Sequence, residues 1–426
     1  MLRRFFICLL SVLVILSVVG GMGFVFAAQG KVDVVKVGVT LPLSGSLATT
    51  GNLTKKAMEL AVEVVNNKYE NLNLPMAETE GFPNFGGAKL ELVFLDDQSN
   101  PEKGMSAVDQ LITQQKVCAV MGSIASSVTA TASQAAERLG IPFLNPLSTS
   151  PGLTERGFKW FFRCTPDDDL FSRNFFQFMV EVKEKKGIDL GKTISLLYEN
   201  TLWGSDVAKA IHKYASQFGY EIIADLPYTA KSASLTSEIQ RLKGVNADIV
   251  MLASYVSDAI LIQTTMKDLN YIPPVILAMD SGHNDPNFIA TVGDLANYIV
   301  SREIFTSTLL ENPTVAKVNE MMIVKTGFPL VQSTAQGFMG TLIMADAISR
   351  AKSLDPEDIR AALAETNIPK EKLIFPWEGC KFNEKGQVST GRGIMVQILE
   401  QKYIPVWPFE IANVEPILPI PAWDKR

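Results

Sequence analysis

The sequence predicts an α/β fold of two lobes, each a parallel, Rossmann-like β-sheet with helices on both faces. Three observations lead to this prediction. Short runs of β-branched residues alternate with amphipathic helical stretches, which is typical of a doubly wound sheet. The alternation begins twice along the chain. The roughly 400 residues that follow the N-terminal segment exceed what one hydrophobic core usually organises.

The first series of elements begins with a valine-rich apolar run at Val34–Leu41, which predicts a buried parallel strand. Apolar residues then recur at steps of three and four between Leu53 and Val65, which predicts a helix with one apolar face. The remaining predicted elements of this series are strands over Leu90–Leu95, Val117–Met121 and Ile141–Leu144, and helices over Gly104–Gln115 and Ser127–Leu139.

The second series repeats this alternation without a visible sequence repeat. Its predicted helices are Phe171–Lys186, Ser205–Phe218, Leu235–Leu242 and Ser257–Leu269, and its strands are Ile194–Tyr198, Glu221–Leu226, Asp248–Leu252 and Val275–Ala278. Further predicted elements are helices over Thr314–Thr326, Thr334–Ala351 and Pro356–Ala364, and tail strands over Ile394–Leu399 and Tyr403–Val406. Asp355 and Pro356 have the residue types of an N-cap and a first helical position. We expect Glu70–Gly87, rich in Pro and Gly, to be a solvated surface insertion.

The N-terminus has the three-part order of a secretory signal, which we place at residues 1–28. Arg3 and Arg4 precede the apolar run Phe5–Val19, and small residues surround a cleavage site near Ala27. An uncleaved membrane anchor is the alternative, because the apolar run could nearly span a bilayer. After cleavage 37 basic and 45 acidic residues remain, so the formal charge is 37 − 45 = −8. We expect an exported protein that is soluble in the periplasm or another extracytoplasmic compartment.

Composition excludes several classes of function. A mildly acidic surface argues against a nucleic-acid partner, which requires a basic stripe. The three cysteines after residue 28, Cys118, Cys164 and Cys380, are widely spaced and odd in number, so no disulfide framework is predicted. No His or Cys pair has the spacing of metal ligands, and we predict neither a metal nor a cofactor.

Polar and aromatic residues follow the predicted strands, at the edge where open α/β sheets bind ligands. In the first series these ends are rich in small hydroxyls, which together with helix N–H groups suit a carboxylate. In the second series they carry two aromatic rings and one carboxylate, which suit an apolar body and an ammonium. The candidate ligand-binding residues are Ser126, Leu147, Ser148, Thr149, Trp203, Tyr255 and Asp280. Together they predict a cleft for a zwitterion.

Each of these residues also has a structural alternative. Ser126 could be a helix N-cap, and Thr149 an ordinary loop hydroxyl. Trp203 and Tyr255 could pack between the lobes without touching a ligand. Asp280 could pair with a nearby arginine or cap the next turn.

The same segments resemble a known family, the type I periplasmic binding proteins of branched-chain amino acid and amide ABC importers, related to the leucine/isoleucine/valine-binding protein. The resemblance extends from about Val35 to about Pro408. Its landmarks are VGVTLPLSG (37–45), GSIASSVTATAS (122–133), IPFLNPLSTSPGLTERG (141–157), FFRCTPDD (161–168), LLYENTLWGSDVA (196–208), DSGHNDPNFIATVG (280–293) and the helical stretch 335–363.

The resemblance implies roles for the candidate residues. Ser126 and Thr149 match the positions that hold the ligand carboxylate, and the Leu147 carbonyl lies near the ammonium. Asp280 matches the acidic residue that pairs with the α-ammonium, and the two aromatics match those that close over the ligand. Two departures from the family stand out: Asp280 is one methylene shorter than the glutamate of the leucine-binding members, and Ala125 replaces the second cysteine of their lobe-1 disulfide.

The resemblance also implies discontinuous lobes, with residues 34–165 plus 303–378 in the first and 166–302 plus 390–420 in the second. The chain would cross a hinge near 163–167, 301–305 and 375–392. Hinge closure would then trap the ligand, and the closed form would be recognised by an ABC permease. The family further implies a monomer.

Two other functions compete with this interpretation. A Rossmann-type enzyme is opposed by the absence of G-x-G-x-x-G, G-x-S-x-G and Walker motifs, and by only two histidines. His212 is expected on a solvated helix face, and His283 at the cleft rim or in a loop. A ligand-sensing receptor module of the same fold is the second alternative. It would usually be fused to a membrane span, and no later apolar stretch here is long enough.

Overall fold

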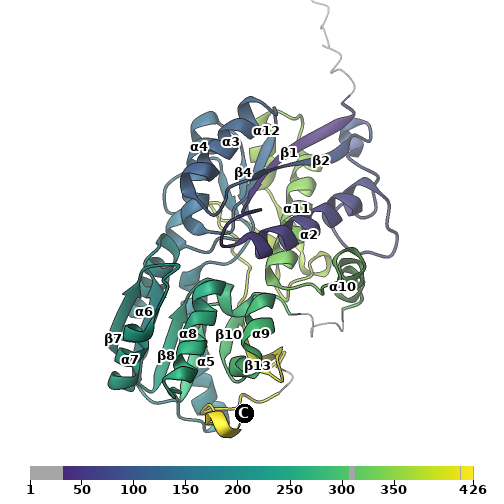
Figure 1. The fold of residues 1–426 in the computed structure, drawn as a ribbon. Coiled ribbons are helices and arrows are strands. Elements are labelled where there is room, and N and C mark those ends of the chain that lie inside the picture. Colours follow the sequence, from purple (N-terminus) through teal and green to yellow (C-terminus); the bar gives the residue numbers. More distant parts are fainter. Residues whose placement is uncertain (1–31, 307–311, 413, 426) are drawn as a thin grey trace, which may run out of the picture. The chain divides into compact units, whose positions relative to one another are not determined.

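A computed structural model describes residues 32–306, 312–412 and 414–425 of the chain, and Asp33–Arg426 forms one compact unit (Figure 1). The predicted signal segment, residues 1–28, lies outside the described residues. Among the residues described, none of the helices combines the length and apolar character needed to cross a membrane.

The first sheet is parallel throughout, as its apolar strands predicted. Its order is β2 (Lys89–Asp96), β1 (Val34–Leu41), β3 (Ala119–Gly122), β4 (Phe143–Asn145) and β5 (Phe161–Arg163). Strand β1 has the predicted bounds, while β5 was not predicted. Three residues, one of them charged, are too few to show a periodic pattern.

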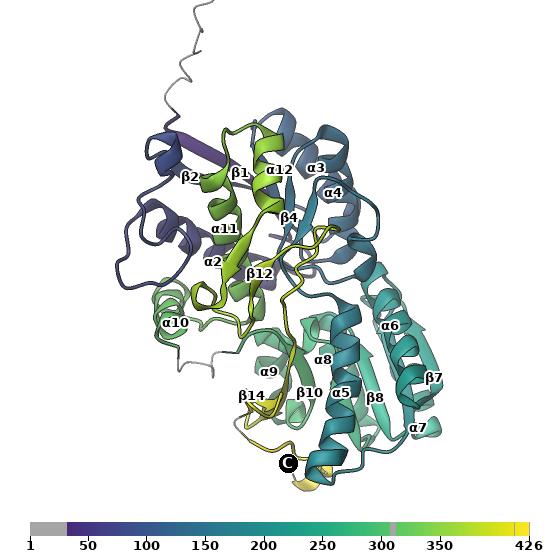
Figure 2. The ribbon, with the colours of Figure 1, turned by 180° about the vertical axis from the view of Figure 1, so that it is seen from behind.

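Helices cover both faces of this sheet (Figures 1 and 2). They are α2 (Ala48–Asn66), α3 (Pro101–Thr113), α4 (Ser126–Leu139), α10 (Pro313–Thr326), α11 (Gln332–Arg350) and α12 (Pro356–Ala364). Val120 of β3 packs in one core cluster with α3 and α4, whereas its neighbour Met121 lies 3.5 Å from a Cβ built on Gly340 of α11. Successive residues of β3 thus face opposite helix layers.

Two helix details follow directly from the sequence. Asp355 accepts a hydrogen bond from the Glu357 N–H, which confirms the predicted cap of α12. Gly337 of α11 allows α2 to approach closely, because a Cβ there would lie 2.6 Å from Cγ2 of Thr54.

The second sheet is mixed, which differs from a wholly parallel expectation. Its order is β14 (Lys402–Trp407), β13 (Ile394–Leu399), β10 (Val300–Glu303), β9 (Val275–Ala278), β8 (Ile249–Ala253), β6 (Thr193–Glu199) and β7 (Glu221–Tyr228). The strands from β7 to β10 are parallel, whereas β13 pairs antiparallel with β10 and with β14. The two tail strands form a hairpin, and a hairpin joins antiparallel strands.

Helices cover both faces of the second sheet as well. They are α5 (Asp168–Lys186), α6 (Leu202–Phe218), α7 (Thr236–Val245), α8 (Val256–Asp268) and α9 (Pro286–Val292). α7, α8 and α9 share one core cluster with alternate residues of the strands. α5 and α6 pack together, and α5 lies in front of the sheet in Figure 2, where α8 lies behind it.

The chain passes between the two sheets after β5, after β10 and before β13. A short antiparallel pair, β11 (Asn367–Pro369) with β12 (Gly379–Lys381), precedes the last passage. These passages lie in or beside the segments where the resemblance implied hinge crossings. The lobe boundaries given above stay a prediction.

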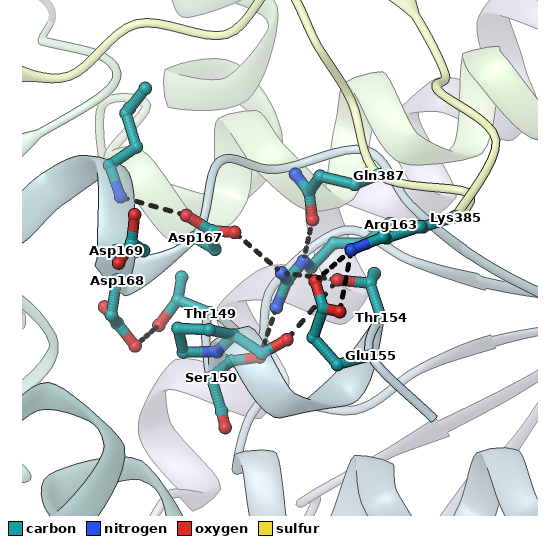
Figure 3. A network of polar contacts seen from close by, with 12 residues as sticks. Thr149, Ser150, Thr154, Glu155, Arg163, Asp167, Asp168, Asp169, Lys385 and Gln387 are labelled. Carbon is teal, nitrogen blue, oxygen red and sulfur yellow. Dashed lines mark hydrogen bonds and ion pairs between the residues drawn. The ribbon is translucent and has the colours of Figure 1, made fainter. Parts of the chain in front are cut away.

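A buried polar network ties the first passage to the third (Figure 3). Arg163, fully buried at the end of β5, donates to the Gln387 side chain at 2.5 Å and to the Ser150 carbonyl at 2.6 Å. It also forms an ion pair with Asp167 at 3.4 Å, just before α5. One side chain therefore contacts two of the connecting segments.

The segment Glu70–Gly87 is not the solvated loop that we expected. Leu72, Leu74, Ala77 and Phe82 are buried within it. The Asn84 amide donates to the carbonyls of Ile348 and Ala351 at 3.2 and 3.1 Å. The insertion therefore packs its apolar side chains inward and satisfies carbonyls at the end of α11.

Cys118, Cys164 and Cys380 are free thiols, as the sequence indicated. Cys164 and Cys380 are buried, and Cys118 is half-buried just before β3.

Candidate functional site

One polar cavity of about 60 Å³ lies where the carboxyl ends of strands from both sheets meet. All seven residues proposed from the sequence line it, namely Ser126, Leu147, Ser148, Thr149, Trp203, Tyr255 and Asp280. Thr50, Asn284, Asp285, Gln332, Ser333 and Gln336 also line it, and the sequence did not identify them. The strand-end rule thus located the cavity but only part of its wall.

The first side of the cavity is the N-terminus of α4. Gly122 ends β3 with φ 127°, and a Cβ there would lie 2.1 Å from the Thr40 carbonyl oxygen, so only glycine fits this turn. Ala125 is the N-cap of α4 and Ser126 its first residue. The suggestion that Ser126 caps the helix is therefore wrong. Its hydroxyl instead accepts from the Ser150 N–H at 3.4 Å.

The segment after β4 forms the adjoining wall. The Ser148 hydroxyl is held by the loop after β3, lying 2.9 Å from both the Ser123 and Ile124 carbonyls. The Thr149 hydroxyl donates to Asp168 at 2.8 Å. Both hydroxyls are thus already fixed by protein partners, and Thr149 connects this wall to the start of α5.

Two aromatic rings face this wall from the second sheet. Trp203, in the first turn of α6, and Tyr255, just before α8, stack with centroids 4.9 Å apart. Tyr255 also packs against Leu47, Ala125 and Val128 of the first lobe. Burial raises the pKa of Tyr255 well above its usual value, although a backbone hydrogen bond at Ser126 lowers it. In this structure the aromatic pair packs between the lobes, over the start of α4.

Asp280 follows β9 in an unusual backbone conformation, with φ 23° and ψ −134°. It is 5% exposed, and its carboxylate lies 2.7 Å from Nη1 of Arg302 and accepts from the Gln332 amide at 2.5 Å. Burial raises the pKa of Asp280, and the Arg302 guanidinium opposes this. In the protein without a ligand, Asp280 therefore pairs with an arginine, which is one of the alternatives given by the sequence.

Arg302 is shared with a second carboxylate. Its Nη2 lies 3.4 Å from Asp168, and its guanidinium lies over the Phe171 ring, 3.6 Å from the centroid. Burial raises the pKa of Asp168 to about 7, although Arg302 lowers it. Two buried carboxylates thus share one buried guanidinium. If both ionise, this group of three carries a net negative charge.

Two further contacts join the lobes beside the cavity. The Thr50 hydroxyl of α2 donates to Asp285 at 2.5 Å, and the Ser150 hydroxyl donates to Asp206 of α6. Each ties a side chain near the first sheet to a carboxylate near the second.

The two histidines contribute no base to the cavity. His283 lies in the short helical turn that connects β9 to α9 and does not line the cavity. It is fully buried against Phe288, with ring centroids 5.0 Å apart, and burial lowers its pKa to about 3. His212 is exposed, as expected, and lies 2.6 Å from Asp225. Within the described ranges, no cluster of three or more His, Cys, Asp or Glu side chains could hold a metal ion.

The sequence did carry a signal for Arg302. The run Ile299–Phe305 reads as an apolar strand interrupted by Arg302 and Glu303, and charged side chains are rarely buried unless they are paired. Gln332, by contrast, carried no comparable signal, because it reaches the cavity only through the packing of α11.

Chemically, the cavity offers hydrogen-bond donors on one side and excess carboxylate on the other. The start of α4 supplies N–H groups at the positive end of a helix dipole. Asp280 lines the cavity and shares Arg302 with Asp168, so the guanidinium balances only one of the two carboxylates when both are ionised. The aromatic pair supplies flat apolar surface between them.

Comparison with known proteins agrees with this architecture. The family model for the periplasmic binding proteins matches residues 34–397. The Leu/Ile/Val-binding protein homolog 7 of Brucella suis is 26% identical over 405 residues, which cover 92% of this chain and 96% of that protein.

Two solved structures share the fold. The branched-chain amino acid transporter substrate binding protein LivJ of Streptococcus pneumoniae, in complex with isoleucine, has a TM-score of 0.73 at 22% identity, covering 91% of this chain and 100% of that one. An ABC transporter solute binding protein of R. palustris in complex with benzoate also has a TM-score of 0.73, at 17% identity, covering 88% and 95%. By the match along most of its length, this chain belongs to the periplasmic binding protein family.

Proposed function

We propose that this chain is the extracytoplasmic substrate-binding protein of an ABC importer, which encloses one small α-amino acid or amide between its lobes and presents the closed form to a membrane permease. In this proposal it is exported by a cleaved signal, acts as a soluble monomer and catalyses no reaction. The observation that carries it is the polar cavity, with hydrogen-bond donors on one wall and the Asp280 carboxylate on the other.

The carboxylate of the ligand would bind at the start of α4. The helix presents its first N–H groups there, and the hydroxyls of Ser126 and Thr149 stand beside them. A backbone hydrogen bond at Ser126 engages Tyr255 in the free protein. A ligand carboxylate would replace this contact, and the Tyr255 ring would then close over the ligand with Trp203.

The α-ammonium would bind at Asp280, with the carbonyl of Leu147 as a second acceptor. A buried carboxylate in excess of its guanidinium partner is costly, and an ammonium would balance it. The pairing of Asp280 with Arg302 does not exclude this role, because Arg302 also serves Asp168. Arg302 then positions Asp280 and limits how far its pKa rises.

The known proteins support a carboxylate ligand in particular. The Streptococcus pneumoniae protein holds isoleucine and the R. palustris protein holds benzoate, and these two ligands share a carboxyl group. What separates an amino acid from a simple carboxylic acid is the ammonium, and in this chain Asp280 is the residue proposed to recognise it.

A thermal-shift screen of α-amino acids, their amides and simple carboxylic acids tests the proposal. At least one α-amino acid should raise the melting temperature, because binding to the native state stabilises it. Asp280→Asn should abolish that shift, whereas Asp225→Asn at an exposed position should leave it intact. Stabilisation by uncharged amides alone, unaffected by Asp280→Asn, would contradict the zwitterion site.

A further inference from the structure

A second cavity of about 330 Å³ adjoins the polar one and is lined mainly by apolar side chains. The two cavities share Asn284 and Gln332. The apolar lining of the second is Leu53, Pro286, Ile289, Phe305, Phe328, Pro329, Leu330 and Val331, with Tyr403 beside them. Ligand sites in proteins typically measure about 300 Å³ or more, so the polar cavity of about 60 Å³ is too small to be the whole site.

In the part of the chain that the structure describes, two amide side chains line both cavities. Gln332 donates to Asp280 at 2.5 Å and accepts from the Ile304 N–H at 2.8 Å. Asn284 donates to the Arg302 carbonyl at 2.8 Å, while its own side-chain oxygen has no partner among the described residues. A ligand ammonium at Asp280 would compete directly with the Gln332 amide. Binding of the ammonium in the polar cavity would therefore displace the Gln332 side chain, which also lines the second cavity.

Among the described residues, Glu303 is the one carboxyl that lines the second cavity. It is 4% exposed, and its Oε2 has no hydrogen-bond partner in the described parts of the chain. As the next residue of β10 after Arg302, it leaves the opposite face of the strand and does not share the guanidinium contacts of Asp168 and Asp280. A backbone hydrogen bond at Ile304 lowers the pKa of this carboxyl, so only Oε2 is without a partner. Leaving that oxygen unpaired is unfavourable, and a donor from a bound molecule would relieve the cost.

We propose that the second cavity is the side-chain compartment of the ligand site and that Glu303 selects a ligand whose apolar chain ends in an amine or guanidinium. This inference rests on the proposed function, because the α-carboxylate and α-ammonium of the same ligand occupy the first cavity. The apolar walls pack against the methylene chain. The terminal cation meets the unpaired Glu303 oxygen in a charge-assisted hydrogen bond.

The proposed role of Glu303 predicts that a cationic ligand releases protons when it binds. Burial raises the pKa of Glu303 well above its usual value; Asp280 raises it further and Arg302 lowers it. Two other charged groups lie at this cavity. Lys402 lines it, and Asp285, like Glu303, raises the pKa of the Tyr403 hydroxyl. Burial thus favours the neutral carboxyl of Glu303, whereas pairing with a cation favours the charged form, so a cationic ligand should release protons on binding and bind more strongly as the pH rises.

Calorimetric titration of the full chain with L-lysine, L-ornithine and L-norleucine tests the inference. The wild-type protein should bind an amine-terminated amino acid at least about tenfold more tightly than norleucine. In buffers of different ionisation enthalpy, the amine-terminated ligands should release more protons than norleucine. Glu303→Gln should remove both the preference and the additional proton release and leave norleucine binding unchanged. Glu221→Gln, at an exposed position on β7, should change neither.

The possible failures are distinguishable. Binding of norleucine with no preference for the amines would overturn the role of Glu303 and leave the proposed function standing. Failure of every amino acid and amide to bind would overturn the proposed function itself. If Glu303→Gln does not fold, the ligand preference and proton release of the wild-type protein still decide the question.

Discussion

Replacing Arg163 with methionine should cost the protein on the order of 3–5 kcal/mol of unfolding free energy. The side chain is fully buried at the end of β5 (Figure 3). Methionine keeps most of its apolar length but removes every donor. The Ser150 carbonyl and the Gln387 side-chain oxygen, 2.6 and 2.5 Å from the guanidinium, would each lose its partner. Each buried acceptor left unpaired costs about 1–3 kcal/mol.

Urea denaturation followed by tryptophan fluorescence measures this loss. Lys385→Met is the matched control, because Lys385 belongs to the same region but its ion pair with Glu155 is exposed, with half of the lysine side chain in solvent. Exposed pairs contribute little to stability, so its denaturation midpoint should equal that of the wild type. A loss below about 1 kcal/mol for Arg163→Met would refute the reasoning that this network joins the connecting segments.

Three further variants test other parts of the structure. Burial raises the pKa of Glu199 from 4.5 to about 7. Its protonated form therefore favours folding at low pH, and this contribution is lost as the pH rises through about 7. Glu199→Gln should remove a decline on the order of 3 kcal/mol in unfolding free energy between pH 4.5 and 7, and an unchanged pH profile would contradict this. Ser150→Ala removes the hydroxyl that donates to Asp206 between the lobes; the ligand should dissociate about tenfold faster in stopped-flow measurements, and an unchanged rate would show that this contact does not hold the closed form. Phe82→Ala should cost about 3–5 kcal/mol in urea denaturation, because the ring is fully buried, whereas a loss near zero would fit the solvated loop first expected there.

Apolar strands and amphipathic or well-capped helices were predictable from the sequence, because periodicity and cap residues indicate them. β1, β9, α12 and β13 have the predicted bounds. Strands β5 and β10 were missed because each is short and carries a charge, Arg163 in one and Arg302 with Glu303 in the other. The two arginines are buried because partners come from distant segments, Gln387 for Arg163 and Asp168 for Arg302.

The candidate site was likewise only partly predictable from the sequence. Positions such as Ser126 and Asp280 follow from sheet topology, since the carboxyl ends of parallel strands meet at one edge. The partners of Asp280 do not follow from topology. Gln332 arrives from α11, 52 residues along the chain, and Arg302 is placed by the pairing of β10 with β9 and β13. Sequence reasoning therefore found the wall of the cavity but not the charge balance within it.

Recognition of both ends of an amino acid is the central claim, and one calorimetric comparison tests it most directly. The amino acid that gives the largest thermal shift is titrated alongside the amine that lacks its α-carboxyl group and the acid that lacks its α-amino group. The account predicts one bound amino acid per chain and at least about tenfold weaker binding of both analogues, because each loses a charge-assisted interaction. Equal binding of the deaminated acid would contradict a role for Asp280 in recognising the ligand.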